Sequence, residues 1–330
     1  MKHIFILNPA AGKGKIEKTL LPRIINDSKR LDIDYEIHRT FGPGDAEQFI
    51  KRRCTGRNAD TNYRFNTDKE GDKLRFYACG GDGTLNEVIN GAFGQQNVEV
   101  AMIPAGTGND FPRNFGSLDD FNDIEGQILG QPRPIDLIRY QQIAEDGKTE
   151  LLPRYGVNMF NIGLDSNAAD LAARLKTYPF IPISLAYILG LVAVLGKKEG
   201  VNLEICLDDG EIYKGDFMLI AIGNGAYCGG GYKGVPYASV DDGLIDVSIV
   251  KEISRFKLVT LLNKYKEGTH LEDPSTADFI EYRKCKRLII SSKNAVKLSV
   301  DGEISMTGKI TFEMIPSCIN FSVPRTCGLI

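Results

Sequence analysis

Short apolar runs alternate with helical patterns over about the first 135 residues of the chain. Apolar residues at helical spacing predict helices at Ile16–Arg30, Asp45–Arg53 and Leu85–Phe93. Strands are predicted where β-branched and aromatic residues are concentrated before a glycine-containing turn, at His3–Leu7, Asp34–Arg39, Leu74–Cys79 and Val98–Ile103. Strands that alternate with helices are typical of an α/β layer with a mostly parallel sheet, where ligands gather at the carboxyl ends of the strands.

The pattern becomes β-rich after about residue 135. Helical spacing interrupts it at Asp165–Lys176, Ile183–Lys198 and Ser254–Glu267. Strands are predicted between Asp-Gly and Gly-Asn turns, at Val201–Leu207, Phe217–Ile222, Leu244–Val250, Arg287–Ser292 and Lys309–Ile315. The sequence therefore predicts two domains, of which the second is mainly β-structure.

Two segments have no assigned chemistry. Thr55–Asp72 is polar and aperiodic, which predicts an exposed insertion. The apolar stretch Ile181–Leu195 is shorter than the roughly 20 residues that cross a bilayer. It predicts a buried helix, a wall of a hydrophobic acceptor site or a surface that touches a membrane, and the sequence leaves these three open.

Composition narrows the class of protein. A net charge of −3 over 330 residues gives no basic surface of the kind that neutralises nucleic-acid phosphates, so we expect no nucleic-acid partner. The seven cysteines are odd in number and contain no C-x-x-C, which predicts reduced thiols in a cytoplasmic protein. His3, His38 and His270 are too few for a multi-histidine metal centre. The N-terminal apolar run is too short for the core of a signal peptide.

Three glycine-rich turns follow predicted strands of the first domain, at Asn8–Lys15, Gly80–Thr84 and Pro104–Phe111. Small residues let backbone N–H groups approach an anion, and a following helix favours negative charge. None of the turns is a Walker A loop, because no G-x-x-x-x-G-K-[ST] occurs. Turns at successive strand ends predict one anion-binding edge of the sheet.

Acidic and polar side chains accompany these glycines. In the second turn Asp82 predicts a magnesium ion beside a nucleotide, and the alternative is that it caps the following helix. The third turn adds the hydroxyl of Thr107, the amide of Asn109 and the carboxylate of Asp110.

These motifs together resemble the catalytic domain of the soluble diacylglycerol kinase family of lipid kinases, to which sphingosine kinases and NAD kinases are related. The block Gly106–Phe111 carries most of the resemblance, since NAD kinases and phosphofructokinases have loops similar to Gly80–Gly83. The resemblance covers nearly the whole chain. Its further motifs, in family order, are Asn8-Pro9-x-x-Gly12, Asn224-Gly225, Gly229–Gly231, Pro236-x-Ala238, Asp242–Val247 and Asp301-Gly302-Glu303.

The resemblance implies a fold with two domains. Residues 1–135, with a returning C-terminal segment 316–330, would form an α/β nucleotide-binding domain of the NAD kinase and diacylglycerol kinase type with a parallel sheet. Residues 136–315 would form a β-sandwich-like domain for the lipid acceptor, with the ATP site in the cleft between the two.

The resemblance also implies residue roles in nucleotide binding. Asp82 would lie near the catalytic Mg²⁺, which Asp110 would help to hold. Thr40 is equally well explained as a turn former. The full set that would line the ATP site is Asn8, Pro9, Ala10, Ala11, Gly12, Thr40, Gly80, Gly81, Asp82, Gly83, Thr84, Leu85, Asn86, Glu87 and Thr107.

Two further acidic motifs receive roles by resemblance. Glu303 is the first choice for the base that accepts the hydroxyl proton and Asp301 the second, and an ordinary hairpin turn is the alternative. Asp242, with the carbonyls of Ser239 and Leu244, would form a structural Mg²⁺ site, and a capped Asp-Gly turn explains these residues equally well.

The expected activity is an ATP- and Mg²⁺-dependent transfer of the γ-phosphoryl group to the primary hydroxyl of diacylglycerol, giving phosphatidic acid. Other acceptors stay open: a sphingoid base, ceramide, another glycerolipid or NAD. A catalytically silent lipid- or nucleotide-binding protein is the alternative from another class. Against it stand the four carboxylates Asp82, Asp110, Asp301 and Glu303.

We expect a cytoplasmic enzyme that visits a membrane surface for its substrate, and a homodimer stays open. Basic side chains attract anionic lipid, each by about 1 kcal/mol. The candidates for this contact, or for an ordinary solvated helix face, are Arg174, Lys176, Lys197 and Lys198.

Overall fold

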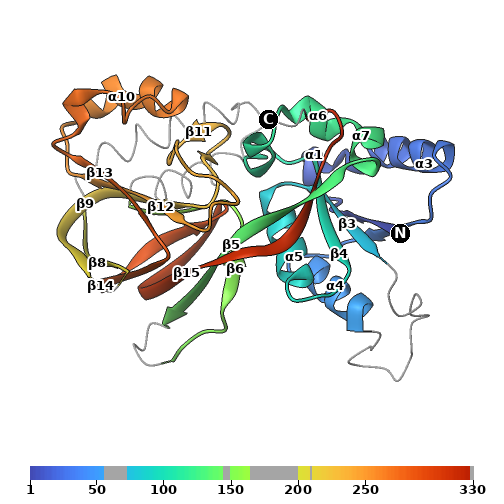
Figure 1. Cartoon of the computed structure of the whole chain (residues 1–330), viewed down its shortest axis with the longest axis horizontal. Coiled ribbons are helices and arrows are strands. Elements are labelled where there is room, and N and C mark those ends of the chain that lie inside the picture. The colour runs from blue at the N-terminus through green and yellow to red at the C-terminus, as the bar shows by residue number, and fades with distance from the viewer. Residues whose placement is uncertain (56–72, 144–148, 164–199, 209, 328–330) are drawn as a thin grey trace. The chain divides into compact units, whose positions relative to one another are not determined.

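A computed structural model describes residues 1–55, 73–143, 149–163, 200–208 and 210–327 (Figure 1). The chain divides into two compact units, Met1–Ile135 with Ser317–Ile330 and Asp136–Pro316. Strands β5 (Gln131–Ile143) and β15 (Glu303–Val323) each run from one unit into the other. These divisions lie within one residue of the boundaries expected from the sequence.

The first unit contains a parallel sheet in the order β15-β4-β3-β1-β2. The C-terminal part of β15 pairs with β4 through Asn320 opposite Glu99 and Phe321 opposite Val100. The four predicted strands are confirmed within two residues, as β1 (Lys2–Leu7), β2 (Tyr35–Arg39), β3 (Leu74–Gly80) and β4 (Val98–Pro104). All residues of β3 and β4 are buried, as expected for strands covered on both faces.

The helices of this unit refine the prediction. The single helix expected at Ile16–Arg30 is wrong, because the chain forms α2 (Ile16–Thr19) and α3 (Leu21–Arg30), and Pro22 has no N–H to continue the hydrogen bonds of α2. Helix α5 begins at Asp82, three residues before the predicted start. The remaining helical elements are α1 (Ala11–Gly14), α4 (Asp45–Thr55), η1 (Phe111–Asn114), α6 (Leu118–Asn122), α7 (Ile124–Ile128) and α5 itself (Asp82–Ala92).

The second unit is built mainly from antiparallel strands. The pairings β14–β7, β7–β9, β9–β8 and β8–β14 form a closed circuit, and β12 and β13 extend it from β9. Several strands exceed the predicted lengths. Their bounds are β6 (Arg154–Gly156), β7 (Met159–Gly163), β8 (Val201–Leu207), β9 (Glu211–Gly223), β10 (Tyr227–Cys228), β11 (Tyr232–Lys233), β12 (Ile245–Lys251), β13 (Ile280–Cys285) and β14 (Arg287–Val300).

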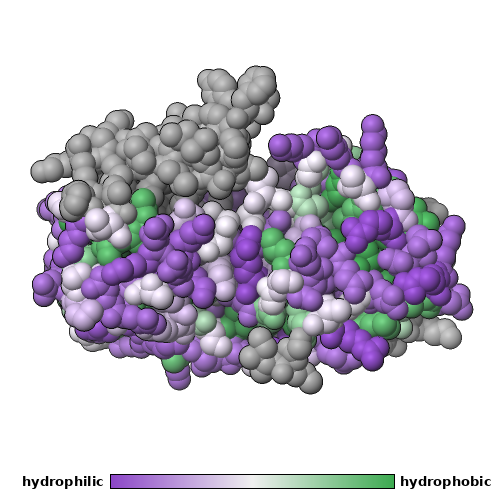
Figure 2. All heavy atoms as spheres, turned by 90° about the horizontal axis from the view of Figure 1, so that it is seen from above, coloured by the Kyte–Doolittle hydropathy of each residue, from purple (hydrophilic) through white to green (hydrophobic). Residues whose placement is uncertain are grey.

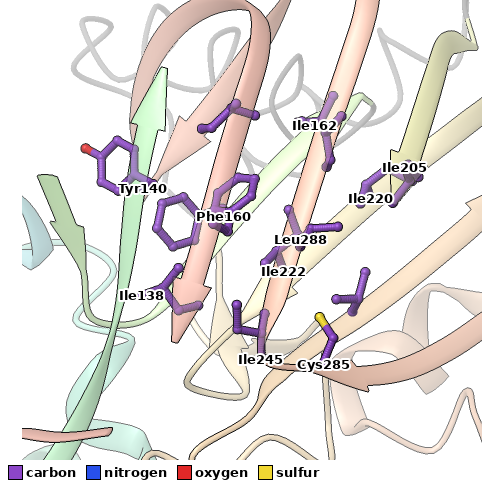
Figure 3. Packing of buried hydrophobic residues seen from close by; sticks show 14 of the residues in the cluster. Ile138, Tyr140, Phe160, Ile162, Ile205, Ile220, Ile222, Ile245, Cys285 and Leu288 are labelled. Atoms are coloured by element: carbon purple, nitrogen blue, oxygen red, sulfur yellow. The ribbon is translucent and has the colours of Figure 1, made fainter. Parts of the chain in front are cut away.

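An apolar core follows from the period-two pattern of these strands (Figure 3). Alternate residues on three of them enter the same cluster, as the pairs Ile138 and Tyr140 on β5, Phe160 and Ile162 on β7, and Ile220 and Ile222 on β9. The predicted helix Ser254–Glu267 is confirmed as α10 (Arg255–Glu267), and a short helix η2 follows at Pro274–Thr276. The Ser254 hydroxyl accepts a hydrogen bond from the backbone N–H of Lys257 at the start of α10.

Other expectations lie outside the described residues. They are the helices at Asp165–Lys176 and Ile183–Lys198, the apolar stretch Ile181–Leu195, the four basic candidates for membrane contact and the insertion after Thr55. Among the helices that the structure describes, none is long and apolar enough to span a membrane. Hydrophilic residues cover most of the coloured surface in Figure 2, and hydrophobic residues form small patches.

A buried ion pair lies at the amino ends of β3 and β4. Arg75 and Glu99 are almost fully buried, and Arg75 Nε donates to Glu99 Oε2 at 2.8 Å. The same guanidinium donates to the carbonyl oxygens of Gln127, Ile128 and Gly130, at 3.0 Å each, so it satisfies the end of α7. Burial raises the pKa of Glu99, but hydrogen bonds from Lys73 and Arg75 outweigh it and lower the pKa overall.

Removing the guanidinium should destabilise the first unit strongly. In Arg75→Ala, Glu99 would keep a buried charge without its main partner and three carbonyls would lose their donor, so the free energy of unfolding should fall by about 3–5 kcal/mol. Urea unfolding measures this. Arg30→Ala, which removes the exposed contacts to Asp27 and Glu125, is the control and should leave the urea midpoint unchanged. Equal effects of the two substitutions would contradict the assignment.

Two buried histidines predict a pH dependence of stability. Burial lowers the pKa of both His3 and His270 from 6.5 to about 4, and the nearby charge of Arg75 adds to the effect at His3. The unfolded chain therefore binds more protons than the folded chain between these values, so the free energy of unfolding should fall as the pH drops from 6.5 towards 4. Urea unfolding at several pH values measures the slope. His270→Phe should reduce the slope, and an unchanged slope would contradict the prediction.

Candidate active site

Three turns come together at the carboxyl ends of β1, β3 and β4, as the sequence predicted. The backbone N–H of Asn8 donates to the carbonyl of Cys79 at 3.1 Å, and the N–H of Ala105 donates to the carbonyl of Gly80 at 2.8 Å. A Cβ atom on Gly106 would lie 2.3 Å from the Cα atom of Gly81. Only glycine fits at this contact, so the second and third turns touch through their backbones.

Asn8 connects the first turn to the second. Its Nδ2 donates to Thr84 Oγ1 at 3.0 Å, and its Oδ1 accepts from the backbone N–H of Ala10 at 3.0 Å. Gly12, Lys13 and Gly14 follow with φ values of 59°, 56° and 73°. The three left-handed residues bend the chain before α2, and the two glycines among them adopt this conformation at little cost.

Asp82 ties the second turn to the third. Its Oδ2 accepts from the backbone N–H of Asn109 at 2.8 Å, and its Oδ1 accepts from that of Asp110 at 2.9 Å. Burial raises the pKa of Asp82, and these N–H groups offset part of the rise because they favour the charged form. The capping alternative is wrong, because the N-cap of α5 is Gly81 and the Asp82 carboxylate bonds to the third turn.

Asp82 and Asp110 border one small space. The position that a Cβ atom on Gly108 would take lies 2.8 Å from Asp82 Oδ2 and 3.2 Å from Asp110 Oδ2. Among the described residues no cluster of three or more acidic, histidine or cysteine side chains forms a metal site. Magnesium, however, is usually bound by one or two carboxylates together with substrate phosphates. This pair of oxygens therefore fits a magnesium ion that arrives with a nucleotide.

Other residues of the expected nucleotide set have structural partners. Glu87 accepts from the backbone N–H groups of Gly44 at 2.8 Å and Ala46 at 3.1 Å, so it fixes the start of α4. The N–H of Thr40 donates to the carbonyl of Leu7, which continues the β2 pairing by one residue. The side chains of Leu85 and Asn86 are buried, whereas Thr107 is exposed on the third turn.

In the second unit, Asp301 and Gly302 form the two-residue turn between β14 and β15. Their φ values are 47° and 94°, as a tight hairpin requires. The Asp301 carboxylate accepts from three consecutive backbone N–H groups, those of Val157 at 3.3 Å, Asn158 at 3.2 Å and Met159 at 3.0 Å. Glu303 is exposed at the start of β15. The segment is therefore a tight hairpin turn, and Glu303 is exposed beside it.

Tyr140 and Arg154 lie near the Asp301-Gly302-Glu303 turn, and the sequence analysis did not predict them as site residues. They are paired residues of β5 and β6, two strands that the sequence analysis missed. Burial raises the pKa of Tyr140 to about 12, the charge of Arg154 opposes the rise, and the charges of Asp301 and Glu303 add to it. The one feature of the sequence that could have indicated β5 was the aromatic Tyr140 close to the mainly apolar run Ile135–Ile138.

At the expected structural cation site, the Asp242 carboxylate forms an ion pair with Lys284. Lys284 Nζ donates to Asp242 Oδ2 at 2.8 Å, and the N–H of Leu244 donates to Asp242 Oδ1 at 3.0 Å. Ser239 Oγ donates to Asp241 Oδ1 at 2.8 Å. This is the capped Asp-Gly turn. The set does not fit Mg²⁺ in this arrangement, because the ammonium group already compensates the carboxylate.

Asp136 completes this turn and was missed by the sequence analysis. Its side chain is fully buried, and its Oδ2 accepts from the N–H of Gly243 at 2.7 Å. Its backbone carbonyl accepts from Asn224 Nδ2 at 2.9 Å. An acidic residue inside the apolar run Ile135–Ile138 was the available signal.

Comparison with known proteins matches both units. Residues 2–140 match the diacylglycerol kinase catalytic domain, and residues 158–323 match the YegS C-terminal NAD kinase beta sandwich-like domain. The protein named "Probable lipid kinase YegS-like" from Shewanella frigidimarina is 31% identical over 92% of this chain and 94% of its own. A protein named "Diacylglycerol kinase" from Staphylococcus haemolyticus is 30% identical over 90% of this chain and 81% of its own.

A solved structure shares the fold. A crystal structure titled as a diacylglycerol kinase from Bacillus anthracis str. Sterne superposes with a TM-score of 0.65 at 20% identity, over 99% of this chain and 98% of that chain. The fold is therefore the expected α/β domain of the NAD kinase and diacylglycerol kinase type with a β-sandwich-like second domain. The chain belongs to the lipid kinase family that includes the YegS-like lipid kinases and the bacterial diacylglycerol kinases.

Replacing Asp82 with asparagine should loosen the third turn. The Asp82 carboxylate accepts two backbone N–H groups, whereas an amide offers a single, neutral oxygen. Hydrogen bonds to charged groups contribute about 1.5–3 kcal/mol each. In Asp82→Asn the amides of Asn109 and Asp110 should exchange with solvent about 10- to 100-fold faster. Hydrogen–deuterium exchange measures this, with Asp110→Asn as the control. Unchanged exchange at both amides would contradict the tether.

Proposed function

We propose that this protein is an ATP- and Mg²⁺-dependent lipid kinase that phosphorylates the primary hydroxyl of diacylglycerol, giving phosphatidic acid and ADP. The observation that carries the proposal is the junction of three glycine-rich turns in the first unit, where Asn8 joins the first turn to the second and Asp82 joins the second to the third. Two family members named diacylglycerol kinase or lipid kinase, at 30% and 31% identity, support the acceptor class. The enzyme would act at a membrane surface, where its acceptor resides.

The first unit supplies positioning for the phosphates. Phosphoryl transfer depends mainly on orienting the reactants and neutralising charge on the phosphate oxygens. The glycines allow backbone N–H groups to approach those oxygens, and α5 begins at the same junction, where its dipole favours an anion. When bound by Asp82 and Asp110, Mg²⁺ would neutralise charge on the phosphates.

The second unit supplies the proton acceptor. Three backbone N–H groups hold the Asp301 carboxylate in place, whereas Glu303 is exposed two residues later. Glu303 therefore takes the role of base: it accepts the proton of the lipid hydroxyl as the hydroxyl oxygen bonds to the γ-phosphorus. The bond between that phosphorus and the bridging oxygen breaks, and ADP leaves. Asp301 positions the turn that carries Glu303.

The roles of the two carboxylates are separable by mutation. Glu303→Gln should lower kcat for diacylglycerol by about 10²- to 10⁴-fold, because the acceptor of the proton is lost, and should leave the affinity for ATP unchanged. Steady-state transfer of labelled phosphate in mixed micelles measures both parameters. Glu204→Gln, an exposed carboxylate on β8 that pairs with Lys214, is the control and should behave as the wild type.

Asp301→Ala should act differently, because it removes the acceptor of three buried N–H bonds and lowers thermal stability together with kcat. Equal activity of Glu303→Gln and wild type would contradict the role of Glu303. Turnover by the wild type on a sphingoid base, ceramide or NAD, with none on diacylglycerol, would replace the proposed acceptor.

A further inference from the structure

Exposed apolar side chains gather at one end of the β5–β6 hairpin. Leu152 is 87% exposed and Leu151 is 44% exposed, immediately before β6. Met306, on β15, is 45% exposed. None of the three belongs to the apolar clusters that the described residues of the second unit form. Three such side chains in water carry a cost that a partner surface would remove.

Hydrogen bonds place these residues together. The N–H of Leu151 donates to the carbonyl of Gln142 at 2.9 Å. The side chain of Gln142 then donates through Nε2 to Ser305 Oγ at 2.9 Å, and Met306 is the next residue. The β5–β6 hairpin and β15 therefore bring their exposed apolar residues to the same region of the unit. We call Leu151, Leu152 and Met306 the apolar tip.

The apolar tip lies close to the proposed base. Glu303 and Met306 are three residues apart on β15, about 10 Å along an extended strand. On the hairpin, Arg154 is two residues from Leu152 and pairs with Tyr140. Burial raises the pKa of the Tyr140 phenol, and the charges of Asp301 and Glu303 raise it further. In the view of Figure 1, the ends of β5 and β6 extend beyond β8 and β14 of the same unit.

We propose that the apolar tip inserts into the interfacial layer of the lipid bilayer that carries the acceptor. This inference rests on the proposed function, because a base that deprotonates a diacylglycerol must reach a hydroxyl held at the bilayer surface. Met306, about 10 Å along the strand from that base, and the two leucines of the hairpin are exposed on the same unit and are placed to bring the base there. A few inserted side chains give weak, reversible binding, comparable to a single acyl chain, which suits an enzyme that must leave after turnover.

A single tryptophan tests insertion directly, because the chain has no tryptophan of its own. The fluorescence of Leu152→Trp should shift to shorter wavelength when vesicles of phosphatidylcholine and diacylglycerol are added, and brominated acyl chains should quench it. The matched control is Ile212→Trp, at a position 54% exposed on β9 of the same unit, whose fluorescence should not change. No quenching at position 152, or equal quenching at both positions, would overturn the proposal.

Activity on two forms of the acceptor tests the consequence. In the double variant Leu151→Ser with Leu152→Ser, transfer to long-chain diacylglycerol in vesicles should fall at least about 10-fold, because the apolar contact with the bilayer is lost. Transfer to a short-chain diacylglycerol dissolved as monomer should not change. Ile212→Ser should match the wild type on both. Equal losses on both forms would overturn the proposal, since they indicate damage to the site.

The two hypotheses fail in different ways. If the wild type phosphorylates neither form of diacylglycerol, the proposed function fails, and the tryptophan experiment still decides insertion. If the wild type is active and the double serine variant equals it on vesicles, insertion is contradicted while the lipid kinase activity stands. A change of oligomeric state in the double variant, without quenching of Leu152→Trp, would assign the apolar tip to contact between copies.

Discussion

The candidate site depends on one carboxylate that holds two loops together. Asp82 accepts the backbone N–H groups of Asn109 and Asp110, and the glycine contact between Gly81 and Gly106 allows the approach. Without a charged acceptor, two N–H groups of the third turn would lack a partner and the turn would be free to move. Because Asp82 is also the first residue of α5, the same bond fixes the third turn against that helix and against β3. The shape of the edge that we propose binds the phosphates therefore follows from this interaction.

In the second unit the Asp301 carboxylate also holds backbone N–H groups. A carboxylate on a tight turn accepts a run of backbone N–H groups, and a neighbouring acidic residue is left exposed. In both units one acidic residue, Asp82 or Asp301, holds backbone N–H groups, and a second acidic residue lies nearby, at Asp110 or Glu303. The motif Asp301-Gly302-Glu303 by itself thus does not tell which of its two acidic residues holds the backbone.

Local patterns predicted β1, β3 and β4 of the parallel sheet well, because these strands are mainly apolar and each ends in a glycine-rich turn. They also predicted that these turns would meet, since parallel strands end on one edge of a sheet. The break between α2 and α3 required the effect of Pro22. The strands β5, β6 and β7 were missed because β5 contains Pro132 and Pro134 near its start and β6 and β7 are only 3 and 5 residues long. The bonds of Asp82 and Asp301 join residues far apart in the chain, and the lysine on Asp242 comes from another strand. Such partners are set by the tertiary fold, so the sequence did not reveal them.

The central claim is that this site transfers a phosphoryl group from ATP to a lipid alcohol. The most direct measurement gives the wild-type protein labelled ATP, Mg²⁺ and an equal mixture of diacylglycerol, sphingosine, ceramide and NAD, and identifies the labelled product by mass spectrometry. The account predicts phosphatidic acid as the main product. Label on NAD alone, or on none of the acceptors while ATP still binds, would contradict it.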